Sequence, residues 1–226
     1  MLHWLENHPV AFPAVEYALE EPNGLLAAGG ALTPEWLLTA YLNGIFPWFN
    51  AKDPIYWWTP DPRMVLYPNE FRCRRSLAKR IRNGGFTLTF NTCFKDVIHA
   101  CGHSRADTWI SPQMCDAYQT LFALGFAHSV EVWHEGELAG GLYGLALGRV
   151  FFGESMFSRC PDASKVALAY LTQLPPDTSF SLIDCQVYSH HLARLGAREI
   201  RRDTFNAQLK QYASLTRWDP PADAFY

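Results

Sequence analysis

The chain has 226 residues, 49% of them hydrophobic, and a formal net charge of −3, which predicts a globular protein with a core large enough for one large domain or two small ones. No apolar run approaches the roughly 18 residues of a membrane-spanning helix, and the N-terminus "MLHWLENHPV" lacks the basic-then-apolar pattern of a signal peptide, so we expect a cytoplasmic protein. The six cysteines form no C-x-x-C pair, which indicates reduced thiols and leaves no zinc ribbon.

Residues 1–62 are rich in turn signals and aromatic side chains, with one well-marked helix in "TPEWLLTAYLNG". Thr33 is a suitable N-cap and Pro34 suits the first helical position. Glu35 complements the helix dipole, and Gly44 is placed to end the helix.

Aromatic residues crowd the segment after this helix, where six fall within thirteen positions: Phe46, Trp48, Phe49, Tyr56, Trp57 and Trp58. Prolines within and just after the segment prevent any long regular element there. Two interpretations stay open. The aromatics form a small core held by rigid turns, or they form a wall on which bases or an aromatic substrate stack.

From residue 63 the pattern becomes α+β. Alternation predicts strands at 63–68, 86–91 and 179–187, and a meander of strands across 128–158 with a turn at 135–137. Capping residues and helical spacing predict helices at 74–84, 94–102, 111–127, 162–174 and 202–214, and one that starts at Ser189. We therefore expect a second, mixed domain over 63–226.

A basic segment lies between Phe71 and Lys95, where the sequence contains no acid. In helical projection Arg75, Lys79 and Arg82 share one face, and Leu77 and Ile81 share the opposite one. A merely solvated helix face usually carries interspersed acids. Their absence favours a surface that binds phosphates, although a basic patch alone identifies no particular nucleic acid.

The segment "SLIDCQVYSHH" raises the possibility of Cys/His chemistry. On a strand, Asp184 and Gln186 project to one face and Cys185 to the other. Cys185 is therefore expected in the core. The polar pair is either a satisfied strand end or part of a site.

The segment "HACGH" offers His99, Cys101 and His103 as metal ligands. A helix spreads these three positions around its circumference, and no fourth ligand is evident. We therefore expect no metal.

Longer blocks carry a resemblance to a known family: "EPNGLLAAGGALTPEWLLTAYLNGIFPWF", "WWTPDPRMVL", "TWIS", "AHSVEVW", "GGLYGLALG", "GESMFSR" and "LIDCQV". In sequence and in order along the chain, these blocks closely resemble the leucyl/phenylalanyl-tRNA–protein transferases. The resemblance implies an enzyme that carries leucine, phenylalanine and, less readily, methionine from aminoacyl-tRNA to a protein whose N-terminus is arginine or lysine. The modified protein then enters N-end rule (N-degron) degradation.

The same resemblance implies a small N-terminal domain, 1–62, packed on a C-terminal domain, 63–226, similar to the N-acetyltransferase (GNAT) superfamily. Aminolysis of an ester is downhill, so the chemistry requires neither ATP nor a metal, and we expect no cofactor. We also expect a monomer. The phosphates that Arg75, Lys79 and Arg82 contact would be those of the tRNA.

By matching positions, the resemblance makes Asp184 and Gln186 the catalytic pair. A free Asp has a pKa of about 3.9 and is a weak base. We therefore favour Asp184 as an ionised group that holds the incoming ammonium or aligns Gln186, with proton acceptance as the alternative.

Glu154 follows the strand "RVFFG" and by alternation shares an apolar face with Phe152, which is costly unless a cation or hydrogen-bond donors meet it. We expect Glu154 to bind the acceptor's amine or basic side chain; Lys165 or Arg159 is the purely structural alternative.

The resemblance assigns the donor's side chain to an apolar pocket formed by Leu142, Phe152, Leu168, Leu171 and Ile183. Trp48 and Trp109 match aromatic positions near the 3′-terminal adenosine, and Tyr41 lies close to Trp48 in sequence.

Two other functions stay open at this point. The first is an acyl-coenzyme A N-acyltransferase, although "SRCPDASK" lacks the glycine-rich backbone cradle that such enzymes place around the pyrophosphate. The second is a non-catalytic RNA-binding module in which Asp184 is structural. Transfer of an amino acid from charged tRNA to a peptide distinguishes all three.

Overall fold

The computed structural model describes residues 2–103 and 110–221. Within these residues the chain forms two sheets with helices packed around them, which confirms the expected α+β class. All strands of the first sheet precede residue 62, and all strands of the second follow it.

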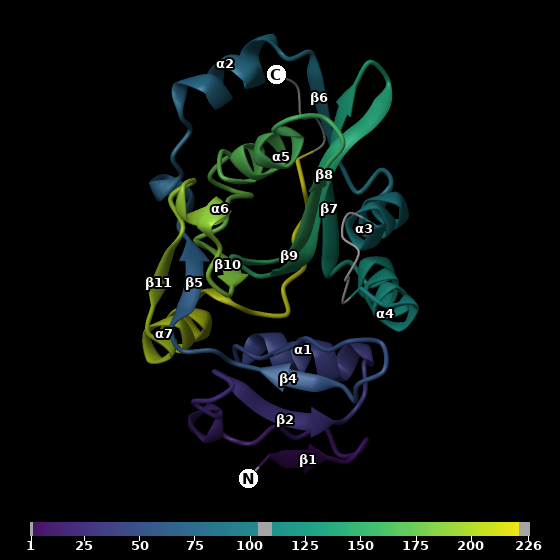
Figure 1. Cartoon of the computed structure of the whole chain (residues 1–226), viewed down its shortest axis with the longest axis vertical. Coiled ribbons are helices and arrows are strands. Elements are labelled where there is room, and N and C mark those ends of the chain that lie inside the picture. Colours follow the sequence, from purple (N-terminus) through teal and green to yellow (C-terminus); the bar gives the residue numbers. More distant parts are fainter. Residues whose placement is uncertain (1, 104–109, 222–226) are drawn as a thin grey trace.

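The first sheet has the strand order β1-β2-β4-β3, with β1 parallel to β2 and the other pairs antiparallel. Its strands are β1 (His3–Leu5), β2 (Leu25–Gly29), β3 (Phe46–Pro47) and β4 (Tyr56–Trp58). A 3-10 helix, η1 (Val15–Tyr17), precedes β2. Helix α1 (Pro34–Leu42) lies between this sheet and the rest of the molecule (Figure 1). Thr33 caps it as predicted, since its hydroxyl accepts from the Trp36 amide at 3.4 Å.

The second sheet has seven strands in the order β11-β5-β10-β9-β8-β7-β6. They are β5 (Arg63–Leu66), β6 (Phe86–Phe90), β7 (Ala127–His134), β8 (Glu137–Leu147), β9 (Val150–Ser158), β10 (Leu182–Gln186) and β11 (Arg198–Ile200). Among the pairs that the described residues form in this sheet, only β9–β10 is parallel. This pairing ends at Phe152 and Asp184, although β9 continues to Ser158.

The remaining helices lie around the second sheet (Figure 1). They are α2 (Arg75–Asn83), α3 (Phe94–His103), α4 (Pro112–Ala123), α5 (Ala163–Leu171), α6 (His190–Ala193) and α7 (Arg202–Tyr212), with a 3-10 helix η2 (Pro68–Glu70) after β5. Helices α3 and α4 lie on one face and α5 lies on the other (Figure 1). Helix α5 ends three residues before the predicted Leu174, ahead of the Pro175–Pro176 pair that cannot continue a helix.

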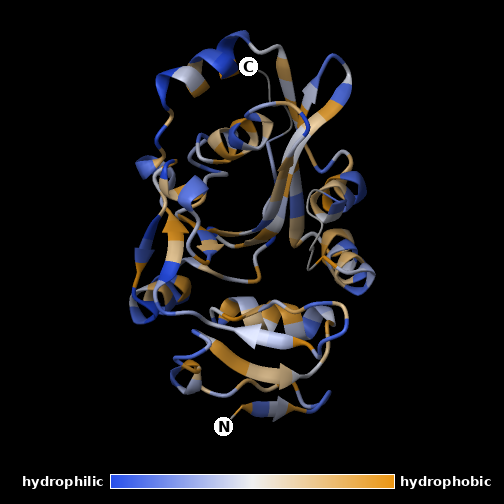
Figure 2. Cartoon of the chain, viewed as in Figure 1, coloured by the Kyte–Doolittle hydropathy of each residue, from blue (hydrophilic) through white to orange (hydrophobic). Residues whose placement is uncertain are grey.

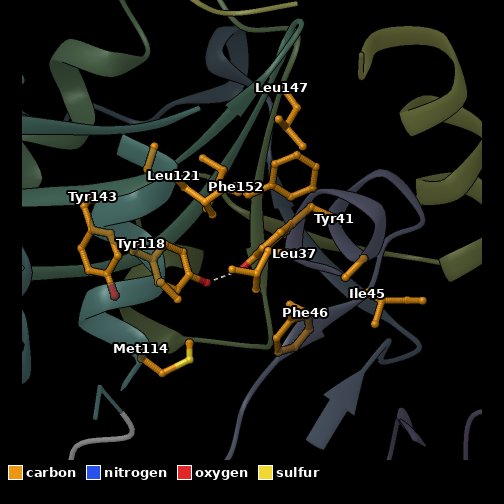
Figure 3. Packing of buried hydrophobic residues seen from close by; sticks show 14 of the residues in the cluster. Leu37, Tyr41, Ile45, Phe46, Met114, Tyr118, Leu121, Tyr143, Leu147 and Phe152 are labelled. Carbon is orange, nitrogen blue, oxygen red and sulfur yellow. Dashed lines mark hydrogen bonds between the residues drawn. The ribbon is translucent and has the colours of Figure 1, made fainter. Parts of the chain in front are cut away.

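Two clusters of buried side chains fill the two faces. The first cluster contains Trp36 and Tyr41 from α1 together with Tyr118 from α4 and Phe152 from β9. The N-terminal residues and the second sheet therefore share one core. Figure 3 shows Tyr41 and Tyr118 approaching each other there from their separate helices.

Charge is distributed unevenly between the two ends of the molecule. Residues 1–51 contain five glutamates, all exposed, and no lysine or arginine. Helix α2 buries Leu77 and exposes Arg75, Lys79 and Arg82, as the helical projection predicts. Figure 2 shows α2 as largely hydrophilic, and Figure 1 places it at the opposite end from β1.

Candidate active site

A cavity of about 680 Å³ opens where β9 and β10 stop pairing. Its walls come from β8 and β9, from β10 and the residues after it, and from α5 and α6. Its polar groups include those of Glu154, Asp184 and Gln186. The cavity is also lined by Trp48, which follows β3 in the N-terminal unit, residues 1–62.

Three of the five side chains predicted for the donor pocket line this cavity: Leu142, Leu168 and Ile183. The structure does not bring the other two to it. Phe152 packs against Tyr41 on the opposite face of the sheet, with ring centroids 5.1 Å apart, and Leu171 packs within the second buried cluster. In their place the cavity has Phe151 and Met156. Strand alternation carries the signal for Phe151, because the neighbour of a core-facing Phe152 must face the other side.

Glu154 lies in a bulge of β9, between the residues that pair with Gly144 and Tyr143 of β8. Its carboxylate accepts hydrogen bonds from the Tyr41 hydroxyl at 2.6 Å and the Tyr118 hydroxyl at 2.8 Å. The two hydroxyl oxygens also lie within hydrogen-bonding distance of each other (Figure 3), but with one proton each they cannot bond to each other while both donate to the carboxylate. The side-chain amide of Gln186 donates to the same carboxylate at 3.4 Å. A bulge re-aims a side chain, and here it presents the carboxylate to three donors.

Burial raises the pKa of Glu154 to about 7, against the lowering effect of the two tyrosine hydrogen bonds. The nearby charge of Asp184 also raises this pKa, and that of Arg63 lowers it. Neither structural alternative for its partner is realised, since Lys165 pairs with Asp162 and Arg159 donates to the Leu138 carbonyl. A carboxyl group with a pKa near 7 suits proton transfer at neutral pH.

Asp184 is wholly buried and forms a two-point ion pair with Arg63, whose Nε and Nη2 donate to its two oxygens at 2.8 and 2.7 Å. Arg63 Nη1 donates to the Gly44 carbonyl at 2.9 Å. The guanidinium lies 4.7 and 4.6 Å from the ring centroids of Phe46 and Phe205. Burying two charges costs desolvation energy, and these hydrogen bonds and ring contacts offset that cost. Of the roles considered for Asp184, the geometry favours alignment, because Arg63 occupies both of its oxygens.

Asp184 positions Gln186 through a hydrogen bond to the Gln186 backbone. The Gln186 amide N–H donates to Asp184 Oδ1 at 3.0 Å. Gln186 has a φ of 58°, and the pairing of β10 with β5 shifts register between these two residues. The side chain of Gln186 therefore reaches Glu154 through a bulge and not through simple strand alternation.

Cys185 projects away from Asp184 and packs with the second buried cluster, as predicted. It nevertheless contributes to the cavity wall, where sequence alternation did not place it. Burial raises the pKa of the Cys185 thiol, followed in effect by the charge of Asp184. The thiol is therefore protonated at neutral pH and is a poor nucleophile.

Replacing Cys185 with alanine should leave turnover within about twofold of the wild-type value and lower the free energy of unfolding by about 1 kcal/mol. Turnover at saturating substrate and chemical denaturation measure the two effects. A trapped acyl thioester on Cys185, or a loss of turnover in folded Cys185→Ala protein, would instead establish a covalent cysteine route.

The residues predicted to stack on the adenosine differ in their exposure. Trp48 lines the cavity and is 43% exposed, so part of its indole is open to a ligand, and its ring centroid lies 5.5 Å from that of Trp58. Tyr41 is wholly buried beneath Glu154 and has no free face for stacking. Trp109 lies outside the described residues. Tyr118 is a site residue that sequence reasoning missed, because its position in α4 reads as ordinary helix core.

Over residues 2–103 and 110–221, no three His, Cys, Asp or Glu side chains are grouped so that they could hold a metal ion. Cys101 is buried, whereas His99 and His103 are exposed. In the same ranges, no helix combines the length and the apolar character needed to span a bilayer.

Comparisons with known proteins define the class of the site as that of a transferase. The model of the leucyl/phenylalanyl-tRNA protein transferase family matches residues 65–210, and the model of that family's N-terminal domain matches residues 30–61. The chain belongs to this family, and it is an aminoacyltransferase.

Similar proteins named leucyl/phenylalanyl-tRNA--protein transferase occur in several bacteria. The protein of Chromohalobacter salexigens is 62% identical over 95% of this chain and 85% of its own length. That of Hydrogenovibrio crunogenus is 55% identical over 92% of this chain and 83% of its own. Among solved structures, a GCN5-related N-acetyltransferase from Kribbella flavida shares 14% identity over 74% of this chain and 60% of its own, with a TM-score of 0.39. Likeness at that level carries no argument about activity.

Proposed function

We propose that this protein transfers leucine or phenylalanine, and less readily methionine, from aminoacyl-tRNA to the N-terminal arginine or lysine of acceptor proteins, and thereby marks them for N-degron degradation. One observation carries the proposal: a carboxylate of raised pKa, Glu154, lies where an apolar cavity meets polar side chains in a chain of this family. The proposed donor implies a cytoplasmic location, since charged tRNA is used there.

The reaction balances without a cofactor. The acceptor's α-amine attacks the ester carbonyl, a C–N bond forms, and the ester C–O bond to the terminal ribose breaks. The proton lost by the amine ends on the departing ribose oxygen or in solvent. Because an α-amine has a pKa of about 7.7–8.0, a useful fraction is already neutral at pH 7. The main tasks are therefore positioning, stabilisation of the oxyanion and removal of one proton.

The site residues divide these tasks between them. Glu154 receives the acceptor's ammonium group and accepts its proton. Gln186 contributes the side-chain N–H that does not donate to Glu154 to the developing oxyanion, and Asp184 holds Gln186 in place through the 3.0 Å backbone hydrogen bond. The cavity beside Leu142 and Ile183 takes the donor's apolar side chain.

The N-terminal unit takes part in this site. Its Trp48 provides an open ring for the terminal adenine, in a role proposed also for Trp109, and its Tyr41 donates to Glu154. We therefore propose that residues 1–62 and 63–226 act as two domains with one active site. We also propose that the protein acts as a monomer.

The exposed cations of α2 are proposed to contact tRNA phosphates. Replacing Arg75, Lys79 and Arg82 together with alanine should weaken binding of charged tRNA whatever its anticodon, and should lower the slope of log affinity against log salt by about one for each charge removed. Turnover at saturating tRNA should barely change. Binding titrations at several salt concentrations measure the effect.

Lys210→Ala provides a matched control, since Lys210 is an exposed cation on α7. It should leave the salt slope unchanged. A loss of turnover at saturating tRNA with unaltered binding would show that α2 does not bind the tRNA backbone.

The decisive test measures transfer of labelled leucine or phenylalanine from charged tRNA to a peptide that begins with arginine. The same peptide with its α-amine acetylated should receive nothing. Acetyl-coenzyme A, offered as the alternative donor, should give no product. Transfer from the thioester but not from tRNA would replace the proposed function with that of an acyl-coenzyme A transferase.

A further inference from the structure

The segment after α7 returns to the second sheet. Two hydrogen bonds fix its path: Arg149 N–H to the Tyr212 carbonyl at 2.9 Å, and Gly148 N–H to the Thr216 carbonyl at 3.2 Å. The segment then inserts Trp218, which is only 8% exposed. The Trp218 indole N–H donates to the Thr178 carbonyl at 2.8 Å and so ties this segment to the loop between α5 and β10.

Trp218 is enclosed by rings from three parts of the chain. Its ring centroid lies 5.0 Å from that of Phe180, 5.0 Å from that of His128 and 5.4 Å from that of Phe90. Burial lowers the pKa of His128 to about 4, so its imidazole is neutral at physiological pH. The three rings packed against Trp218 are therefore all uncharged.

A line of rings joins Trp218 to the wall of the donor cavity. Phe180 lies between Trp218 and Phe151, with centroids 5.0 and 5.3 Å from theirs. Phe151 lines the cavity, whereas Phe180 and Trp218 do not. On the other side of Trp218, Phe90 stands 5.4 Å from Tyr170 of α5, the helix that supplies Leu168 to the same cavity. Trp218 therefore reaches one wall of the cavity through Phe180, and it reaches helix α5 through Phe90 and Tyr170.

We propose that Trp218 is a positioning residue that limits the depth of the donor side-chain cavity, and that it thereby sets the preference between leucine and larger donors. The proposal rests on the proposed function and adds to it the element that supports the cavity from behind. Protein interiors are close-packed. While Phe180 and Trp218 are in place, Phe151 therefore has no space to move away from the cavity. Removing the largest of these rings leaves a void into which Phe180 can move, and Phe151 can follow.

Trp218→Ala is the central variant, measured as kcat/KM for transfer from tRNA charged with leucine, phenylalanine or tryptophan to an arginine-starting peptide. The deeper cavity should raise the phenylalanine-to-leucine ratio of kcat/KM by about three- to tenfold, a part of what an apolar pocket discriminates by direct contact. Transfer of tryptophan, the bulkiest of the three donors, should gain relative to leucine by more than transfer of phenylalanine does.

Two matched variants separate cavity depth from anchoring of the segment. Trp218→Phe keeps a ring in place but loses the hydrogen bond to Thr178, and its donor ratio should stay within about twofold of the wild-type ratio. Leu215→Ala alters the same segment at a side chain that is 54% exposed. It should change neither the ratio nor turnover.

An unchanged donor ratio in folded Trp218→Ala protein, even with a lowered melting temperature, would overturn the proposal and leave Trp218 as a structural anchor. If Trp218→Ala does not fold, Phe180→Leu shortens the same line of rings from within and should shift the ratio in the same direction; an unchanged ratio there overturns the proposal equally. Failure of the proposed function looks different, because the wild-type protein would then transfer none of the three amino acids.

Discussion

Replacing Arg63 with methionine is expected to lower the free energy of unfolding by about 3–5 kcal/mol, because it leaves the carboxylate of Asp184 buried without its partner. Both side chains are at most 1% exposed, so water cannot replace the lost hydrogen bonds. Turnover of the protein that still folds should also fall, since Asp184 would no longer hold Gln186. Chemical denaturation and saturating kinetics measure the two effects.

The chain offers a matched control for this prediction. Arg198 forms a similar two-point pair with Glu70, but these side chains are 51% and 41% exposed. Arg198→Ala should therefore reduce stability by no more than about 1 kcal/mol. The double variant Arg63→Met with Asp184→Asn should recover part of the lost stability, because no unpaired charge remains. If it is less stable than Arg63→Met alone, the unpaired charge is not the cause.

The second large effect is expected for Glu154→Gln, which should lower turnover by about 10²–10⁴-fold, the range typical of a positioned proton acceptor. Wild-type kcat/KM should rise with pH through about 7 as Glu154 loses its proton. In the variant this rise should disappear, and the remaining dependence should follow the acceptor's amine at about 7.7–8.0. A pH profile of kcat/KM for the acceptor, which reports the free enzyme and the free amine, tests this in both proteins. An identical rise through pH 7 in the variant would remove Glu154 from proton transfer.

Two further measurements identify the cause of the pH effect. Tyr41→Phe removes a hydrogen bond that lowers the pKa of Glu154, so the rise should move to higher pH. Stability gives an independent check. A pKa that folding raises from 4.5 to about 7 means that the folded state binds the proton more tightly, so this group's contribution to stability is lost as pH increases through that window. The loss should be absent in Glu154→Gln.

Helix starts were the part of the fold most open to prediction from sequence, because capping is local. Thr33, Ser111 and Ser189 each accept a hydrogen bond from the amide three residues later, as their positions predict. Strands β1, β3 and β11 have two or three residues each and no alternation long enough to detect. Their conformation depends on distant partners, as when β11 pairs with β5.

The candidate site was predictable to the extent that its signals are local or shared with the family. Asp184, Gln186 and Glu154 do meet at one end of the cavity. Arg63 was not found, because its bond to Asp184 spans 121 positions and leaves no pattern in either segment. Tyr118 is similar, since a core tyrosine and one that donates to a buried carboxylate look alike in sequence. The bulge at Gln186 depends on pairing between strands, which no run of residues on one strand reports.

The separation of charge between the two ends of the molecule bears on how fast a nucleic acid finds its place. The exposed glutamates of residues 1–51 and the cations of α2 lie toward opposite ends, so the molecule has an electric dipole along its length despite a net charge of only −3. A polyanion diffusing toward it is repelled from one end and drawn to the other, and it is turned before contact. The nucleic acid then tends to meet the protein at α2, which raises the association rate. This increase becomes smaller at higher salt concentration, because ions screen the charges.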